Sequence, residues 1–522
     1  MKAPFRVLYS NDCSCAAHVS PYHKEGEPFT ADKLRAAIDE AAGADAFLLQ
    51  PGSCEVAHWR SRECPIKEHY RWFEDAYGVG AGGHAKYVLE GGDVFDILIE
   101  HCRKVGIAPF ASLRLNDAHG KEYLHAPKGT VPAVIGQNIS RFYVEHPEYR
   151  LGPDVSKWAD HVYNWAEPEV RCRKLAFVRE LCAYDVDGLE LDFMRHLPYF
   201  RLAETTSEQR RSIMAEFVRQ ARRALDETAR GGRRRWLCVR VPAFLDRYDP
   251  NGLEVPAFLA AGVDMVNIST TYYTEQDTDL AAIRALAPAA SVYCEMTHCT
   301  HKQNSGPETG NRLATPRQIL TTAHQAYARA KVDGVSFYNF VYYRSRQPFA
   351  SGGEGLYEPP FEVLRQVGDP AWLARQPQQW FLAPGSWTNG FGQHQVPRAL
   401  RPGEQAVFRM DLLPPDGGWR GEGKLRLQAR APLAGAALSA KVNGLELEAT
   451  GDVSDPYGAA YRVLTGTPGH WRAWRVPAGT LKDGANTIHI SLRKGLDATL
   501  VYLDPVAGSA SYTEDATAAE TT

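Results

Sequence analysis

The chain has 522 residues, of which 44% are hydrophobic and 23% are charged, and its formal net charge is −3. A chain of this length exceeds what one hydrophobic core usually supports, so two or three domains are expected. The near-neutral charge gives no reason to expect nucleic acid or an anionic membrane as a partner. No run of about 18 apolar residues occurs, so no transmembrane helix is predicted.

The first segment, MKAPFRVLYSND, lacks the long apolar core of a signal peptide and leads directly into a strand-like run. We therefore expect either a cytoplasmic protein or a mature extracytoplasmic form from which a signal peptide has been removed. The ten cysteines are dispersed, which favours reduced thiols over a disulfide scaffold. Spacing alone leaves a disulfide near the functional site open, and the sequence does not indicate an oligomeric state.

Eight apolar, β-branched or aromatic runs predict strands at 6–12, 46–52, 107–117, 187–193, 236–243, 265–270, 291–296 and 334–340. Segments with helical periodicity lie between them, the longest at 169–184, 206–231 and 315–331. Eight strands that alternate with helices predict an α/β fold, a (β/α)8 TIM barrel. A doubly wound sheet is the competing fold, but it normally carries a glycine-rich turn after the first strand, and NDCSC is not one.

One glycine-rich segment, GVGAGG at 78–83, matches the spacing of a dinucleotide-binding turn. It follows the aromatic stretch HYRWFEDAY rather than a strand, so we interpret it as a flexible loop. No cofactor is expected from this sequence.

The composition changes near residue 370. From about 385 to 508, short strand-like runs separated by turn residues predict an antiparallel β-sandwich. The predicted domains are a catalytic barrel at 1–370, an accessory sandwich at 371–508 and a polar, disordered tail at 509–522.

The stretch DGLELDFMRHL (187–197) carries two acids, Glu190 and Asp192, in a segment otherwise suited to burial. Alternate side chains of a strand share a face, so both acids point to the same side. Burying carboxylates costs several kcal/mol unless they are paired, hydrogen-bonded or hydrated. The two acids therefore belong either to a structural ion-pair network or to a strand end that opens into a site.

Active sites of TIM barrels lie at the C-terminal ends of the strands. The candidates there are polar or aromatic: Arg114, Asn116, Asp117, Glu190, Asp192, Arg195, Arg240, Tyr273, Glu275, Glu295, His298, Tyr338 and Asn339. Such a set suits a sugar, because hydroxyls need donors and acceptors, ring faces stack on aromatic residues, and glycosidic cleavage needs two carboxyl groups. We predict Asp192 and Glu295 as the catalytic pair and the other candidates as substrate-binding residues.

The two acids are assigned different roles. Arg195, close to Asp192 in sequence, is expected to hold that carboxylate ionised, which suits a nucleophile or a base. Apolar neighbours are expected to raise the pKa of Glu295, which suits a general acid, and Glu275 is the alternative acid. Glu190 lies one layer deeper and is expected to pair with Arg114 or Arg240.

The segment CEMTHCTHK (294–302) places Cys294, His298, Cys299 and His301 close together. Their spacing fits no standard zinc pattern, so no metal is predicted, and His298 is expected to donate to a sugar hydroxyl or a carboxylate.

The run VDGLELDFMR resembles the fourth-strand motif of the glycosyl-hydrolase-like, family ten-like TIM-barrel proteins, and LRLNDAH resembles a motif of their bacterial members. The resemblance covers about residues 5–345. It implies a bacterial glycoside hydrolase of carbohydrate metabolism, with Asp192 as the leading catalytic candidate. Related barrel hydrolases usually place two glutamates on strands four and seven, and the aspartate here leaves the roles of Asp192 and Glu295 open.

We therefore predict a glycoside hydrolase that acts on an oligo- or polysaccharide, and the arginines are compatible with an anionic substrate. A polysaccharide lyase and a non-catalytic carbohydrate-binding barrel remain the alternatives. The pattern VNG…VPAGTLKDGANTIHISL looks like the jelly-roll modules found beside many glycosidases. Packing against the barrel is its expected role, because only Trp471 and Trp474 stand out as aromatic candidates for sugar binding.

Overall fold

The structure is a computed structural model of the chain. It describes residues 2–12, 20–24, 27–53, 55–154, 157–303, 310–342, 344, 358–384, 394–419, 421–454 and 467–506. The predicted tail at 509–522 lies outside these residues. None of the helices in these ranges is both long and apolar enough to cross a membrane.

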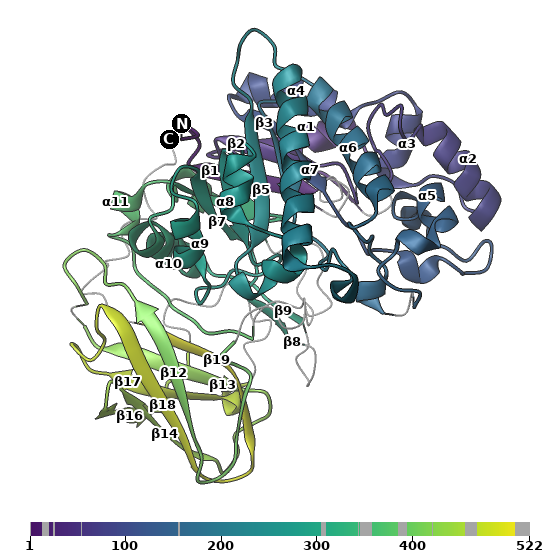
Figure 1. Cartoon of the computed structure of the whole chain (residues 1–522). Helices are drawn as coiled ribbons and strands as arrows, with labels where there is room; N and C mark the ends of the chain where they lie inside the picture. The colour runs from purple at the N-terminus through teal and green to yellow at the C-terminus, as the bar shows by residue number, and fades with distance from the viewer. Residues whose placement is uncertain are drawn as a thin grey trace.

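Eight parallel strands close into a barrel in the order β1-β10-β7-β6-β5-β4-β3-β2, which confirms the predicted TIM barrel (Figure 1). The strands are β1 (Val7–Asp12), β2 (Ala46–Gln50), β3 (Ala108–Arg114), β4 (Gly188–Asp192), β5 (Trp236–Pro242), β6 (Met265–Ser269), β7 (Ser291–Met296) and β10 (Gly334–Tyr338). Each one falls on a predicted run. The alternation of buried strand and amphipathic helix was therefore sufficient to identify this architecture.

Helices surround the barrel (Figure 1). They are α1 (Ala31–Asp39), α2 (Ile66–Tyr77), α3 (Gly83–Leu89), α4 (Val94–Val105), α5 (Arg141–Glu145), α6 (Pro168–Ala183), α7 (Ser207–Glu227), α8 (Val255–Ala260), α9 (Leu280–Leu286), α10 (Pro316–Gln325) and α11 (Pro370–Leu373). Local signals fix several ends: Thr206 and Thr315 form capping boxes with Gln209 and Gln318. Gly78, in the left-handed region, ends α2, so GVGAGG connects two helices and does not follow a strand.

The inward positions of the barrel strands change from apolar to polar along the barrel axis. At the N-terminal end Phe5 packs edge-to-face on Phe110 and Trp236, and Gly188 leaves room for the Phe110 ring, which a Cβ there would meet at 2.0 Å. Two and four residues further along, the same strand faces carry polar side chains: Gln50, Ser112, Arg114, Glu190, Asp192, Arg240, Asn267, Ser269, Glu295 and Tyr338. The period of two thus places a buried polar layer at the C-terminal end.

Two antiparallel sheets form the sandwich beyond the barrel (Figure 1). One sheet holds β11 (Arg398–Leu400), β19 (Ala498–Val506), β13 (Gly423–Ala429), β17 (Trp471–Val476) and β16 (Glu448–Thr450). The other holds β12 (Gln405–Leu412), β18 (Gly484–Lys494), β14 (Ala437–Val442) and β15 (Leu445–Glu446). The domain boundary predicted at 370/371 falls in α11 and stays a prediction.

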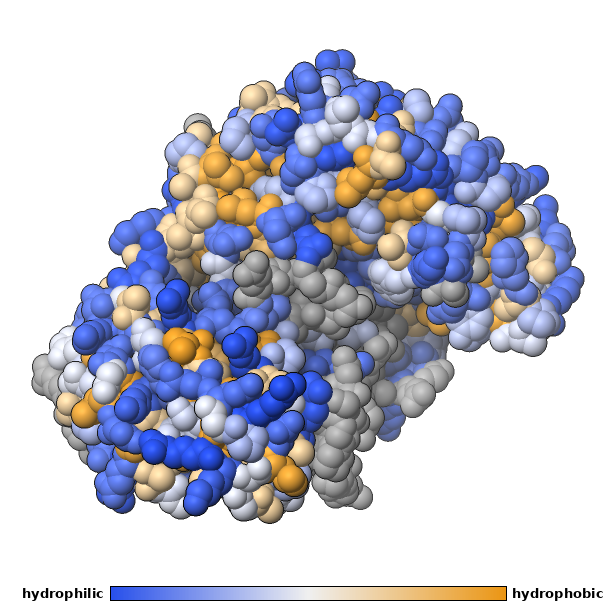
Figure 2. Space-filling view, turned by 60° about the horizontal axis from the view of Figure 1, so that its bottom comes forward, coloured by the Kyte–Doolittle hydropathy of each residue, from blue (hydrophilic) through white to orange (hydrophobic). Residues whose placement is uncertain are grey.

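Trp471 and Trp474 are buried in the sandwich, which leaves neither as an exposed platform for a sugar. The sandwich lobe, at the lower left of Figure 2, turns a mostly hydrophilic face to the viewer.

A short hairpin connects the barrel mouth to the sandwich. It consists of β8 (His301–Gln303) and β9 (Gly310–Arg312) and follows β7. The guanidinium of Arg312 lies 3.7 Å from the centre of the Tyr502 ring of β19, and the His301 ring stacks on the same tyrosine. The Tyr502 hydroxyl accepts a 2.5 Å hydrogen bond from Gln318 of α10. These buried contacts fix the sandwich to the loop that follows β7.

Candidate active site

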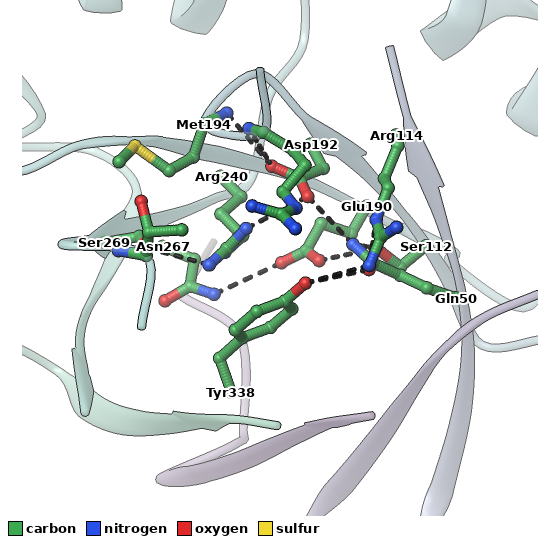
Figure 3. Close-up of polar contacts among 12 residues, drawn as sticks. Gln50, Ser112, Arg114, Glu190, Asp192, Met194, Arg240, Asn267, Ser269 and Tyr338 are labelled. Carbon is green, nitrogen blue, oxygen red and sulfur yellow. Dashed lines mark hydrogen bonds and ion pairs between the residues drawn. The ribbon is translucent and has the colours of Figure 1, made fainter. Parts of the chain in front are cut away.

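Arg240 is the centre of the polar layer at the C-terminal end of the barrel (Figure 3). Its Nε and Nη2 donate to the two oxygens of Glu295, each at 2.7 Å, and its Nη1 donates to Asp192 at 3.0 Å. The guanidinium also lies 3.8 Å from the centre of the Tyr338 ring. One fully buried cation therefore holds the two predicted catalytic acids, which come from the non-adjacent strands β4 and β7.

Four donors surround the carboxylate of Asp192. The backbone N–H groups of Met194 and Arg195 donate to Oδ1, and the side chains of Gln50 and Arg240 donate to Oδ2, at 2.8–3.1 Å. These donors fix the position of the Asp192 carboxylate, which is buried at the end of β4.

Glu295 accepts from Ser269 and Asn267 in addition to Arg240. Burial raises the pKa of Glu295, and the contacts with Arg240 oppose that shift. The direction agrees with the expectation for a general acid. The hydrogen-bonding capacity of both carboxylates is filled by protein groups, so a substrate atom reaches either one only if a donor moves.

Glu190 does not bind an arginine, contrary to the prediction. Its Oε1 accepts from Ser112 at 2.7 Å and its Oε2 from Asn267 at 3.2 Å, and no ion pair involves it among the described residues. Burial first, and then the charge of Asp192, raise the pKa of Glu190 to about 7. The predicted pairing with Arg114 or Arg240 is therefore wrong, because both arginines lie one layer higher, beside Asp192.

Arg114 does not contact Glu190 but binds residues from β1, β2, β10 and the loop after β3. It donates to Asp12 at 2.8 Å, to Asp117 at 3.3 Å, to Gln50 at 3.0 Å and to the Tyr338 hydroxyl at 3.2 Å. Asn339, in the left-handed region at φ 43°, completes this web, because its amide donates to Asp12 and its oxygen accepts from the Asp12 backbone. The predicted residues Arg114, Asp117, Tyr338 and Asn339 thus lie together.

Other predicted site residues lie apart from this layer or form hydrogen bonds with the backbone of a loop. Asn116 exchanges two hydrogen bonds with the backbone of Tyr163 and so anchors the long loop after β3. Tyr273 is buried among Cys299, Leu313 and Tyr338. Glu275 lines a cavity of about 180 Å³ between the barrel and the sandwich. Its Oε2 lies 3.6 Å from Nδ1 of His394. Burial lowers the pKa of His298 to about 3, so this side chain is neutral.

A second centre at the mouth contains Asp117, His119 and Arg195. His119 Nδ1 lies 3.0 Å from Asp117 Oδ1, and Arg195 Nη2 lies 3.0 Å from His119 Nε2 and 3.0 Å from the Tyr272 hydroxyl. The His119 side chain is 38% exposed, whereas that of Asp117 is fully buried. Sequence reasoning missed His119, although it belongs to the quoted LRLNDAH segment, because a loop residue carries no strand periodicity that would place it.

The trio Asp117, His119 and His196 offers ligand atoms within 4.8 Å of one another, a spacing that could hold a metal ion. The hydrogen bonds do not fit one. Arginine has no acceptor, so Arg195 uses the lone pair of His119 Nε2 and leaves the proton on Nδ1. Likewise the backbone N–H of Ala118 uses the lone pair of His196 Nδ1. Beside Asp117, His119 Nδ1 therefore carries a proton that it donates to Asp117, and the lone pair of His196 Nδ1 is taken by Ala118, so neither nitrogen offers a lone pair to an ion there.

No protein-family model matches the chain, and no curated protein matches it in sequence. Solved structures of similar fold include several glycoside hydrolases. A cycloisomaltooligosaccharide glucanotransferase from Paenibacillus sp. is 12% identical, with a TM-score of 0.30 over 96% of this chain and 57% of its own. A family 18 N-acetylglucosaminidase from Paenibacillus barengoltzii is 12% identical, with a TM-score of 0.38 over 70% of this chain and 99% of its own.

A family 27 β-L-arabinopyranosidase from Geobacillus stearothermophilus is 11% identical, with a TM-score of 0.37 over 94% of this chain and 97% of its own. This chain spans little more than half the length of the glucanotransferase. The resemblance to the family ten-like proteins stays a prediction.

Proposed function

We propose that this protein is a glycoside hydrolase that cleaves an oligo- or polysaccharide at the C-terminal face of the barrel. One observation carries the proposal: Asp192 and Glu295 converge from β4 and β7 on the single guanidinium of Arg240. Glycosidic cleavage needs one carboxylate and one carboxylic acid near the same bond. Asp192, held by four donors, suits the carboxylate, and the raised pKa of Glu295 suits the acid.

The surroundings of the pair also support a sugar as the substrate. Arginine and tyrosine side chains border the mouth, and Trp158, 40% exposed, packs edge-on against His119 and His196. Aromatic edges and dense hydrogen-bonding groups suit a polyhydroxylated ligand. The arginines Arg114, Arg195 and Arg240 are compatible with a substrate that carries a carboxylate or sulfate.

The test is a panel of neutral, uronic and sulfated polysaccharides assayed for new reducing ends and for absorbance near 232 nm. Hydrolysis without unsaturated products supports the proposal. Unsaturated products would identify a lyase, and binding without cleavage would identify a carbohydrate-binding barrel.

Variants then test the residues. We expect Asp192→Asn and Glu295→Gln each to lower kcat by at least about 10², the lower range for acid–base catalysis. The exposed acids Asp226→Asn and Glu216→Gln are matched controls and should retain turnover. If Glu295→Gln kept its turnover while Glu275→Gln lost it, the acid would belong to the loop after β6.

A further inference from the structure

We propose that His119, oriented by Asp117, is the base that activates water in this site, and that the reaction therefore inverts the anomeric configuration. This inference rests on the proposed glycoside hydrolase function. It assigns a role to a residue outside the predicted pair and changes the role of Asp192.

The hydrogen bonds fix the tautomer of His119. Arg195 can only donate, so its 3.0 Å contact with Nε2 requires a lone pair on that nitrogen. The proton of the neutral ring is then on Nδ1, which lies 3.0 Å from Asp117 Oδ1 and donates to it. A buried carboxylate that orients one ring nitrogen and leaves the other as an acceptor is the arrangement by which enzymes prepare a histidine base.

The surroundings keep this base neutral. Loss of solvent lowers the pKa of His119, an effect that Arg195 and Arg114 reinforce and that Asp117 opposes. His196 faces the same ring edge-on at 4.6 Å, and the Tyr272 hydroxyl shares the Arg195 donor. The side chain of His119 is 38% exposed, whereas those of Asp192 and Glu295 are at most 1% exposed. His119 is thus the more accessible proton acceptor.

The centre belongs to the same mouth as the acid pair. Arg195 donates its backbone N–H to Asp192 and its Nη2 to His119, so one residue contacts both. On the other side, Gln50 donates to Asp192 and accepts from Arg114, which in turn binds Asp117. Two routes of hydrogen bonds therefore join the base to the carboxylate.

The step balances as a single displacement. Arg195 first withdraws from His119 Nε2, because the lone pair that it occupies is the one that must take the proton. Nε2 then takes a proton from water as the water oxygen bonds to the anomeric carbon. The glycosidic C–O bond breaks, and the leaving oxygen takes the proton that the proposed function assigns to Glu295. Asp117 stabilises the imidazolium, and Asp192 stabilises the positive charge that develops on the sugar ring.

The experiment uses the full chain with the substrate found in the panel. We expect His119→Gln to lower kcat by at least about 10² with KM changed only a few-fold, and the product formed first to have the inverted configuration by NMR. The control His489→Gln, on a half-buried position of the sandwich far from the mouth, should leave turnover unchanged. Retention of configuration, or normal turnover of His119→Gln, overturns the inference about His119. Hydrolysis by the wild-type protein in the same assay would still support the proposed function.

The pH profile and the tautomer separate a base from a structural residue. The wild-type kcat/KM should rise with pH through the lowered pKa of His119 and fall again where Glu295 loses its proton, and His119→Gln should lose the rising limb. Asp117→Asn should move the limb to lower pH and Arg195→Gln to higher pH, because the two side chains act on the pKa in opposite directions. Nitrogen-15 NMR of the wild type should show the proton on Nδ1 of His119, and a proton on Nε2 instead would overturn the assignment without any substrate.

Discussion

Arg240 binds Glu295 through two hydrogen bonds of equal length, 2.7 Å, and both side chains are buried. This fork is the strongest geometry that an arginine and a carboxylate can adopt. Asp192 shares the same guanidinium, so two buried acidic side chains depend on one cation. The network is therefore expected to matter for stability as well as for chemistry.

We expect Arg240→Met to lower the free energy of unfolding by about 3–5 kcal/mol, because it leaves two buried carboxylates without their cation. Urea denaturation followed by a barrel signal measures the change. Arg493→Met, on an exposed sandwich strand, is the control and should cost less than about 1 kcal/mol. Adding Asp192→Asn and Glu295→Gln to Arg240→Met should restore part of the loss, and no recovery would contradict the charge explanation.

Glu190 should make stability depend on pH. Its pKa is raised from 4.5 to about 7 in the folded protein, so the folded state holds a proton that the unfolded state releases between these values. The contribution of Glu190 to the free energy of unfolding is fully present below its unfolded-state pKa and is lost as the pH rises through its folded-state pKa. The steepest loss is about 1.4 kcal/mol per pH unit. Wild type should thus lose about 3 kcal/mol between pH 4.5 and 7 relative to Glu190→Gln. Equal pH dependence of the two proteins would show that Glu190 ionises normally.

Strand register explains why Glu190 does not pair with an arginine, although its sequence position predicts such a partner. Alternation correctly placed Glu190 and Asp192 on one inward face, because the period of a strand is local. The neighbour across the sheet depends on strand register, which the sequence did not supply. The register sets Ser112 beside Glu190 and both Arg114 and Arg240 beside Asp192. Arg240 therefore binds the upper acid, Arg114 binds Asp12 and Asp117 instead, and neutral groups hold the lower acid.

The mouth loops were the least predictable part of the site. All eight barrel strands could be located, because buried strands and amphipathic helices alternate strongly along the chain. His119 and Tyr272 follow strand ends on irregular backbone, and their positions depend on contacts with distant loops, such as the bond from Thr297 to the Tyr272 carbonyl. The short hairpin of β8 and β9 was missed because its strands have three residues each and are stabilised by the sandwich.

The hairpin contact should control the order of the loop after β7. We expect Tyr502→Ala to increase amide hydrogen exchange at 297–302 by about tenfold or more, because it removes the ring against which Arg312 and His301 pack. Exchange in β1 to β5 should not change. Leu445→Ala, an exposed position at the far edge of the other sheet, is the control. Unchanged exchange at 297–302 would show that the barrel orders this loop without the sandwich.

We expect the cysteines to be non-catalytic. Cys294 alternates with Glu295 and lines the cavity outside the barrel wall, so it faces away from the axis. Burial raises the pKa of Cys102, Cys182 and Cys294 to about 12, which leaves almost no thiolate to react at neutral pH.

Among the described cysteines only Cys172 is exposed, whereas Cys13, Cys15 and Cys54 lie outside the described residues. Mild alkylation of the native protein, mapped by peptide mass, should therefore label Cys172 and leave Cys294 unlabelled, with turnover retained. The Cys172→Ala variant is the control and should lose that label while it keeps its activity. Loss of turnover in parallel with labelling of Cys294, in a protein that is still folded by circular dichroism, would place a reactive thiol in the site and contradict the prediction.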